Sequence, residues 1–152
     1  MRLKVSLTGV VLATALLVLP AAVQAQAAPA PSNHYVTVTK FSAPFNAEGQ
    51  KVWWWIDSVM VPSAKMNPNV VHYSVGGHNW GSSAGDIVII AEYANWNAID
   101  ADCAACIEWF EKRQPAEGTP ERTAWDEAQA AFFKHYFGHS DEIYAVLDSR
   151  SK

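Results

Sequence analysis

Three histidines and two carboxylates in this 152-residue chain have the residue types and spacing for acid–base chemistry. His72 and Glu92 lie in two short apolar segments, and His78 lies in the glycine-rich stretch between them. His139 and Asp141 occur together in the sequence GHSDE. Imidazole titrates near neutral pH and burial raises the pKa of a carboxyl group, so the two can exchange protons with a substrate. We therefore take His72, His78 and Glu92 as candidate catalytic residues.

Each of these residues also has a plain structural interpretation. His72 can be a hydrogen-bonded strand residue, His78 a loop residue and His139 a helix C-terminal cap, while Asp141 can be an ordinary surface charge. Glu92 is the strongest candidate, because a carboxylate in an apolar strand requires a reason. If Glu92 faces solvent or is held by a backbone cap, the enzyme hypothesis loses its best acid–base group. Imidazole and carboxylate groups at such positions can also bind a metal, but the sequence assigns no metal ligands and leaves any cofactor unknown.

Aromatic side chains supply candidate ligand contacts. Neighbouring residues on a helix point ~100° apart, so the three consecutive tryptophans from Trp53 to Trp55 cannot all face one core. At least one of them should be exposed, against an interface or a ligand, although aromatic residues anchor interfaces more often than they perform chemistry. The candidate ligand-binding residues are Trp54, Tyr73, Trp80, Tyr93, His139 and Asp141.

The candidate residues are positioned by a predicted β-hairpin from Val70 to Tyr93. Its two apolar strands are joined by a Gly/Ser/Asn-rich loop. One strand and one helix precede it, and a long helical region and a short strand follow. This βαββαβ order predicts an α+β ferredoxin-like fold, an antiparallel sheet with helices on one face. The other predicted elements are a strand over 35–41, a helix with its N-cap at Asn46 that Pro62 ends or kinks, a helix over 98–112, a helix over 124–137 and a strand over 142–147. Thr119 and Pro120 supply an N-cap and a first-turn proline ahead of the last helix.

Side-chain alternation in the hairpin indicates a second subunit. Without a bulge, His72 and His78 share one face of the first strand, and Tyr73 lies on the other. Glu92 on the second strand has the same parity as the two histidines, and we expect this shared face to point into the barrel. The second strand is apolar on both faces, with Ile89 on one and Ile90 on the other, so both faces should be covered. The helices cover one face only. We therefore expect a homodimer joined across the other face, as in a dimeric α/β barrel.

The two cysteines, Cys103 and Cys106, form a C-x-x-C pair. The next residue is Ile107, which excludes a haem attachment motif, and no second pair exists for a zinc site. A position within a helix makes a disulfide between them geometrically awkward, whereas a helix N-terminus would depress a thiol pKa. Three interpretations of the pair remain open: a redox-active site, a disulfide that only staples the fold, and two small buried residues.

The N-terminus has the pattern of a signal peptide. A basic start, an apolar run over 5–19 and small residues near Ala25 and Ala27 are typical of cleaved export signals. An uncleaved anchor would need ~20 apolar residues, which is longer than this run. The expected organisation is a signal peptide over 1–25, a flexible segment over 26–34 and one domain over 35–148, in a periplasmic or secreted protein with no membrane partner after cleavage.

Charge excludes some partners. Removal of Arg2 and Lys4 with the signal leaves nine basic and fifteen acidic side chains, a formal net charge of −6. Such a surface disfavours nucleic acid and anionic membranes. The one adjacent basic pair, Lys112 and Arg113, lies among glutamates.

The order of elements resembles that of ferredoxin-like dimeric α/β-barrel proteins, a superfamily that includes small monooxygenases, haem-degrading enzymes and stress-responsive barrels. The segments HNWG (78–81), DIVIIAEY (86–93) and YFGHSDEIY (136–144) more closely resemble a family of uncharacterised exported bacterial proteins. The resemblance covers most of residues 34–148 and implies the fold. It transfers no catalytic residue, because members of the superfamily place different groups in the barrel.

Two classes of function follow. One is an enzyme that acts on a small apolar or aromatic molecule in a pocket lined by Trp, Tyr and His. The alternative is a non-catalytic binding or structural homodimer in the periplasm, with the aromatic residues in the interface. The surroundings of Glu92 distinguish the two.

Overall fold

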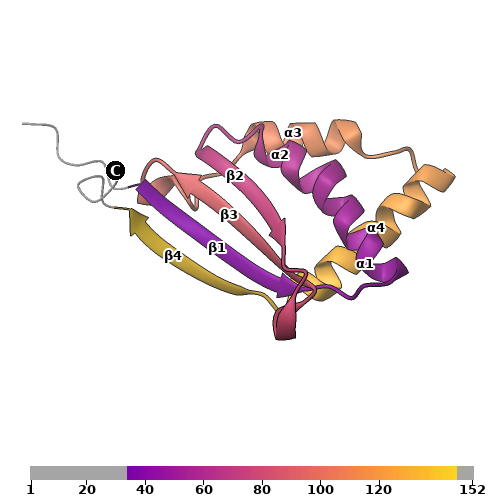
Figure 1. The fold of residues 1–152 in the computed structure, drawn as a ribbon. Coiled ribbons are helices and arrows are strands. Elements are labelled where there is room, and N and C mark those ends of the chain that lie inside the picture. Colours follow the sequence, from indigo (N-terminus) through magenta and orange to yellow (C-terminus); the bar gives the residue numbers. More distant parts are fainter. Residues whose placement is uncertain (1–33, 147–152) are drawn as a thin grey trace, which may run out of the picture.

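The computed structural model describes residues 34–146, so the predicted signal peptide and the segment before His34 lie outside the described residues. Four strands and four α-helices make up the fold (Figure 1). In chain order they are β1 (His34–Ser42), α1 (Ala47–Trp55), α2 (Val61–Ala64), β2 (Val70–Gly77), β3 (Asp86–Tyr93), α3 (Ala104–Arg113), α4 (Pro120–Tyr136) and β4 (Ser140–Val146). In this part of the chain, no helix is long and apolar enough to cross a membrane.

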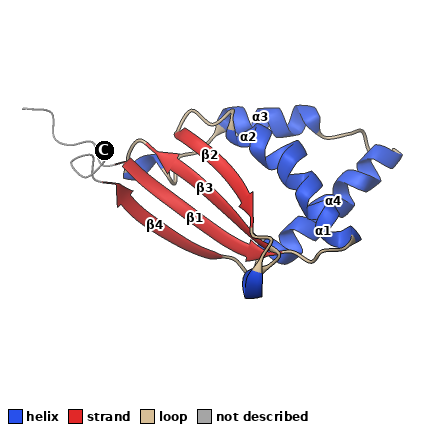
Figure 2. Ribbon diagram, in the orientation of Figure 1, coloured by secondary structure: helices blue, strands red, loops and turns tan. Residues whose placement is uncertain are grey.

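The strands form one antiparallel sheet in the order β2-β3-β1-β4. The helices lie on one side of it (Figure 2). This is the ferredoxin-like βαββαβ fold, so the predicted fold class and the central hairpin are confirmed. A bulge between Val70 and His72 shifts the register at the start of β2, after which His72 lies opposite Glu92 and Tyr73 opposite Ala91. We call the side of the sheet under the helices the covered face and the other side the open face.

The core fills the space between the covered face and the helices. Ile87 and Ile89 project from β3 and are almost fully buried, and Phe132 of α4 and Trp55 of α1 pack over the sheet. Trp55 lies edge-on to Trp125, with ring centroids 5.1 Å apart. Burying each such side chain contributes roughly 1.5–3 kcal/mol. This packing fixes the helices on the covered face.

Local sequence signals set where two helices begin. Asn46 Oδ1 accepts hydrogen bonds from the backbone N–H groups of Glu48 and Gly49, as expected of an N-cap. Thr119 caps α4 in the same way, with Pro120 in the first turn. The start of α1 passes so close to Pro44 that a Cβ atom on Gly49 would lie 1.7 Å from the Pro44 carbonyl oxygen. A side chain at position 49 would therefore displace this turn.

The first helical region does not end at Pro62, contrary to one of the two outcomes predicted for it. A π-helical segment, Ile56–Met60, joins α1 to α2, and the Val61 N–H donates to the Ile56 carbonyl five residues earlier. The wider turn admits one extra residue. Pro62 lies in the first turn of α2, so it interrupts little of the hydrogen bonding, and the helix continues to Ala64.

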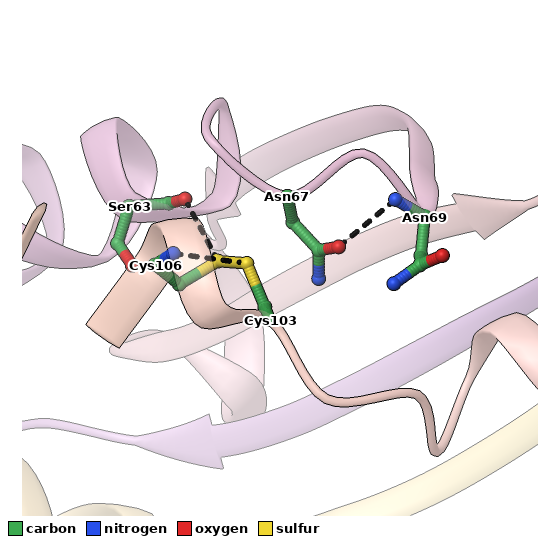
Figure 3. Close-up of a disulfide and its surroundings, with 5 residues drawn as sticks. All are labelled: Ser63, Asn67, Asn69, Cys103 and Cys106. Atoms are coloured by element: carbon green, nitrogen blue, oxygen red, sulfur yellow. Dashed lines mark hydrogen bonds between the residues drawn. A yellow bond between two sulfur atoms is a disulfide. The ribbon is translucent and has the colours of Figure 1, made fainter. Parts of the chain in front are cut away.

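The helix predicted over 98–112 is shorter than expected. A 3₁₀ turn at Trp96–Ala98 and a non-helical stretch precede α3, whose N-cap is Cys103. Cys103 and Cys106 form a disulfide, with Cα atoms 5.2 Å apart (Figure 3). The prediction that their spacing makes a disulfide awkward is wrong, because Cys103 has non-helical dihedrals and lies outside the helix.

Candidate functional site

A cavity of about 420 Å³ lies between the covered face and the helices, at the end of the core nearest α2 and α3. Its wall is mainly aromatic and aliphatic. The largest apolar residues that line it are Trp55, Val59, Met60, Phe110, Phe132 and Phe133. A cavity of this size and lining suits a small, largely apolar organic molecule.

Three tyrosines line this cavity: Tyr73 from β2, Tyr93 from the end of β3, and Tyr136 from the last turn of α4. Tyr73 and Tyr93 reach it because odd-numbered residues of these strands point to the covered face. Tyr136 stacks on Phe132 four residues earlier, with centroids 5.1 Å apart. We call these three residues the tyrosine cluster.

Burial raises the phenol pKa of all three members of the tyrosine cluster above the ordinary value of 10. The phenols also act on one another. Electrostatic effects of Tyr136 and Tyr93 add to the increase for Tyr73, and those of Asp141 and Tyr93 add to the increase for Tyr136. A hydrogen bond with Thr37 partly offsets the effect of burial on Tyr93. At neutral pH the three hydroxyls are therefore uncharged and can donate hydrogen bonds.

Small polar groups add to the cavity wall. Ser63 of α2 and Asn67 of the following loop lie beside the tyrosine cluster. The Asn67 side-chain oxygen accepts a hydrogen bond of 2.9 Å from the Asn69 backbone N–H, which fixes the orientation of the amide. The cavity thus combines an apolar body with a few placed hydrogen-bonding groups, the usual character of a ligand site.

His139 and Asp141 lie behind the tyrosine cluster without lining the cavity. The His139 ring stacks on Tyr136 with centroids 4.3 Å apart. One of its ring nitrogens lies 2.6 Å from the Tyr136 carbonyl oxygen and the other 2.8 Å from the Asp141 carboxylate. Asp141 also accepts a hydrogen bond of 2.6 Å from Thr39. In this arrangement the two candidates support the position of Tyr136.

His72 and Glu92 lie opposite each other on the open face, away from the cavity. Glu92 is only partly exposed, and its carboxylate lies 2.9 Å from Nδ1 of His34. His34 falls in the segment predicted to be flexible, but it is the first residue of β1. The Glu92 carboxylate is therefore paired with the His34 imidazole, neither free in solvent nor held by a backbone cap, and it lies on the face away from the cavity.

His78 does not share a strand face with His72, because β2 ends at Gly77. It is an exposed loop residue, and its backbone pairs with Asp86 and Gly85. The residue borders a second, smaller cavity of about 260 Å³ near the start of α1. The three candidate catalytic residues thus do not form one constellation.

Trp54 and Trp80 also lie away from the tyrosine cluster. Trp54 is 44% exposed on the outer side of α1 and contacts Trp125 edge-on, which confirms that one of the three tryptophans is exposed. Trp80 is 83% exposed in the loop between β2 and β3. Of the predicted ligand-binding residues, the structure brings Tyr73 and Tyr93 into one cavity and places His139 and Asp141 beside it.

Tyr136, Ser63 and Asn67 line the cavity but are not among the site residues predicted from the sequence. A signal existed for Tyr136, because helical spacing from Phe132 places either His135 or Tyr136 on the inner side of the last helix. The sequence carries no such signal for Ser63 and Asn67. Ser63 lies in α2 directly after the π-helical segment, and Asn67 lies in the loop after α2, so helical periodicity does not predict where their side chains point. Within residues 34–146, no group of three or more His, Cys, Asp or Glu side chains is arranged to hold a metal ion.

No protein-family model matches the sequence, and a comparison with curated proteins finds no match. The fold is similar to those of several solved structures. One is a dimeric protein of unknown function with a ferredoxin-like fold from Bacteroides fragilis (TM-score 0.45, 12% identity, 74% of this chain and 96% of that chain covered). Another is a dimeric ferredoxin-like protein of unknown function from Thermobifida fusca (TM-score 0.46, 13% identity, 76% of this chain and 92% of that chain covered). A third is a monooxygenase of Streptomyces coelicolor, solved in complex with nanaomycin D (TM-score 0.47, 10% identity, 80% of this chain and 94% of that chain covered). At these identities the likeness concerns the fold alone.

Proposed function

We propose that this protein binds a small aromatic molecule that carries a carbonyl or hydroxyl oxygen, in the cavity beside the tyrosine cluster. One observation carries the proposal: three uncharged phenols converge in an apolar cavity of about 420 Å³. The aromatic wall favours a flat, apolar ligand through edge and face contacts. The phenols favour an acceptor oxygen on that ligand, because each can donate one hydrogen bond.

The lining favours binding over acid–base catalysis. No Asp, Glu, Lys or His side chain is among the residues that line this cavity in the described part of the chain. The phenols hold their protons at neutral pH, so they serve as donors and do not act as general bases. Glu92 and His72 lie on the opposite face of the sheet. A ligand in the cavity would therefore be held and oriented without a proton acceptor of suitable pKa beside it.

The experiment is a binding survey of quinones, aromatic ketones and phenols, read by native mass spectrometry and by tryptophan fluorescence, since Trp55 lines the cavity. For a ligand found in this way, Tyr73→Phe and Tyr136→Phe should each raise Kd roughly 2- to 12-fold, the loss of a hydrogen bond of about 0.5–1.5 kcal/mol. Tyr144→Phe is the matched control, because Tyr144 lies on the open face and is exposed.

Ala64→Phe provides an independent test, since Ala64 lines the cavity and a phenyl group there would occupy part of it. We expect a folded protein that has lost the ligand. A ligand that binds Ala64→Phe and both tyrosine variants with unchanged Kd lies elsewhere, and the proposal would then be wrong.

We further propose that two copies of the protein associate through their open faces. Val36, Val38 and Val88 form the centre of this face together with Ile90, which is 37% exposed. Basic and acidic groups surround this centre. The His34–Glu92 pair lies at one end of the face and the Lys40–Asp86 pair at the other. An apolar centre within a charged border fits a self-complementary, twofold interface.

Sedimentation at micromolar concentration tests this association. We expect a dimer, and we expect Ile90→Asp to sediment as a folded monomer, because a carboxylate would be buried at the centre of the interface. Lys112→Asp is the control, since it introduces the same side chain at an exposed position of α3. A wild-type protein that remains monomeric across this range would contradict the proposal.

Export remains a proposal that rests on the sequence. We expect cleavage after Ala25 or Ala27 and a periplasmic or secreted protein, and the Cys103–Cys106 disulfide is compatible with an oxidising compartment. The intact mass of protein recovered from the periplasm or medium tests it. A species that retains residues 1–25 would contradict it.

A further inference from the structure

We propose that the Cys103–Cys106 pair is a redox-active site that exchanges electrons with a thiol or disulfide of a second molecule. This inference goes beyond ligand binding in the cavity. It starts from the position of the pair at the beginning of α3, a helix of ten residues (Figure 3). The two residues between the cysteines, Ala104 and Ala105, are small and exposed, so no bulky side chain of that turn covers the bond.

The surroundings of the two sulfur atoms differ. The backbone N–H of Cys106 donates to Cys103 Sγ at 3.1 Å. Cys106 Sγ lies 3.5 Å from the Ser63 carbonyl oxygen in α2 and borders the cavity. A disulfide sulfur has no proton, so the contact with Ser63 is not a hydrogen bond in the oxidised state. Reduction supplies that proton, and the Cys106 thiol then has an acceptor in place.

These two contacts assign different roles to the reduced cysteines. A hydrogen-bond donor and the N-terminus of α3 both favour the thiolate form at Cys103. A carbonyl oxygen favours the protonated form at Cys106. The thiolate is the nucleophile in exchange reactions, so Cys103 is the attacking residue and Cys106 the resolving residue. Asp100 and Asp102 precede Cys103 and oppose the thiolate, but they also favour a partner of positive charge.

The reaction balances without a further reactant. The Cys103 thiolate attacks one sulfur of a partner disulfide, which forms a mixed disulfide and releases the other partner sulfur as a thiolate. The Cys106 thiol then loses its proton and attacks Cys103 Sγ, which releases the second partner thiolate. Two electrons and two protons pass from the protein dithiol to the partner, and the protein disulfide forms. With a partner dithiol the same steps run in reverse.

The test uses the folded, full-length mature chain. Cys106→Ser leaves Cys103 alone, and Cys103→Ser leaves Cys106 alone, so the two variants lose the same disulfide and any structural cost it carries. With oxidised glutathione as the probe, we expect Cys103 to form its mixed disulfide at least tenfold faster than Cys106, as measured by quenching with acid and intact mass. Equal rates in the two variants would overturn the assignment.

Wild-type protein supplies the second readout. We expect dithiothreitol to reduce the disulfide while the protein stays folded, and the reduced protein to convert oxidised glutathione to two molecules of glutathione. Cystamine, a cationic disulfide, should react faster than oxidised glutathione, because Asp100 and Asp102 attract positive charge. Reduction of insulin would show that protein disulfides are also accepted. A disulfide that resists dithiothreitol until the chain unfolds would show a structural staple and overturn the proposal.

Discussion

The two faces of the sheet use the same strands differently. On β3, alternate residues Ile87 and Ile89 are buried under the helices, while their neighbour Ile90 and the carboxylate Glu92 belong to the open face. The covered face holds the cavity and the uncharged phenols. The open face holds the Lys40–Asp86 ion pair and the His34–Glu92 pair around an apolar centre. A period of two therefore sorts the residues into two sets, and the position of the helices decides which set can line a cavity.

The largest expected effect compares two neighbouring isoleucines. Ile89 is 6% exposed on the covered face and Ile90 is 37% exposed on the open face. Ile89→Ala should lower the free energy of unfolding by about 2–5 kcal/mol, because it leaves a void in the core. Ile90→Ala should lower it by less than about 1 kcal/mol at low protein concentration, with a larger loss in dimer affinity. Chemical denaturation at two concentrations measures both, and equal costs at both sites would contradict this division of the faces.

Alkaline titration tests the covered face. The pKa of each member of the tyrosine cluster is higher in the folded protein than the unfolded value of about 10. Their contribution to stability is thus complete below pH 10 and is lost as the pH rises through the folded values. The ultraviolet signal of tyrosinate should show at least these phenols ionising late, with unfolding. Tyr73→Phe should remove part of that late signal, whereas early ionisation of Tyr73 would show that the cavity is open to water.

Acid titration tests two hydrogen-bonded carboxylates outside the cavity, Asp86 and Glu48. Hydrogen bonds from Lys40 and Ser42 lower the pKa of Asp86 below 3.8, and those from Lys134 and His135 lower that of Glu48 below 4.5. These contributions to stability are present above the unfolded pKa values and are lost as the pH falls through the folded values. The melting temperature should therefore decrease as the pH is lowered below about 4. Asp86→Asn should make that fall shallower, and an unchanged slope would show that the Lys40 pair contributes nothing.

The smallest effect is expected at the pair between His34 and Glu92. A partly exposed contact between a histidine and a carboxylate contributes about 0–1 kcal/mol even when both groups are charged, so Glu92→Gln should change the melting temperature little and leave ligand binding unchanged. Loss of ligand binding in a folded Glu92→Gln or His72→Ala protein would return the site to the open face and contradict the cavity assignment.

The sequence predicts the fold well because alternation and helix signals are local. It assigns His72 and Glu92 to one face correctly, and both helix starts at Asn46 and Thr119 are confirmed. It could not predict which face the helices cover, since that depends on packing between distant elements. The disulfide was misjudged for a related reason, because a shift of the helix start to Ala104 decides its geometry.

The π-helical segment Ile56–Met60 makes the cavity sensitive to chain length. Successive helical residues are ~100° apart, so deleting one residue from this segment would restore regular winding and rotate everything after it by about that angle. Ser63 and Ala64 would then turn away from the cavity, while Trp55 before the segment would keep its place. A single-residue deletion here would thus change the shape of the cavity without substituting any of the residues after it, and it offers a route by which a fold of this kind could open or close a binding chamber in one step.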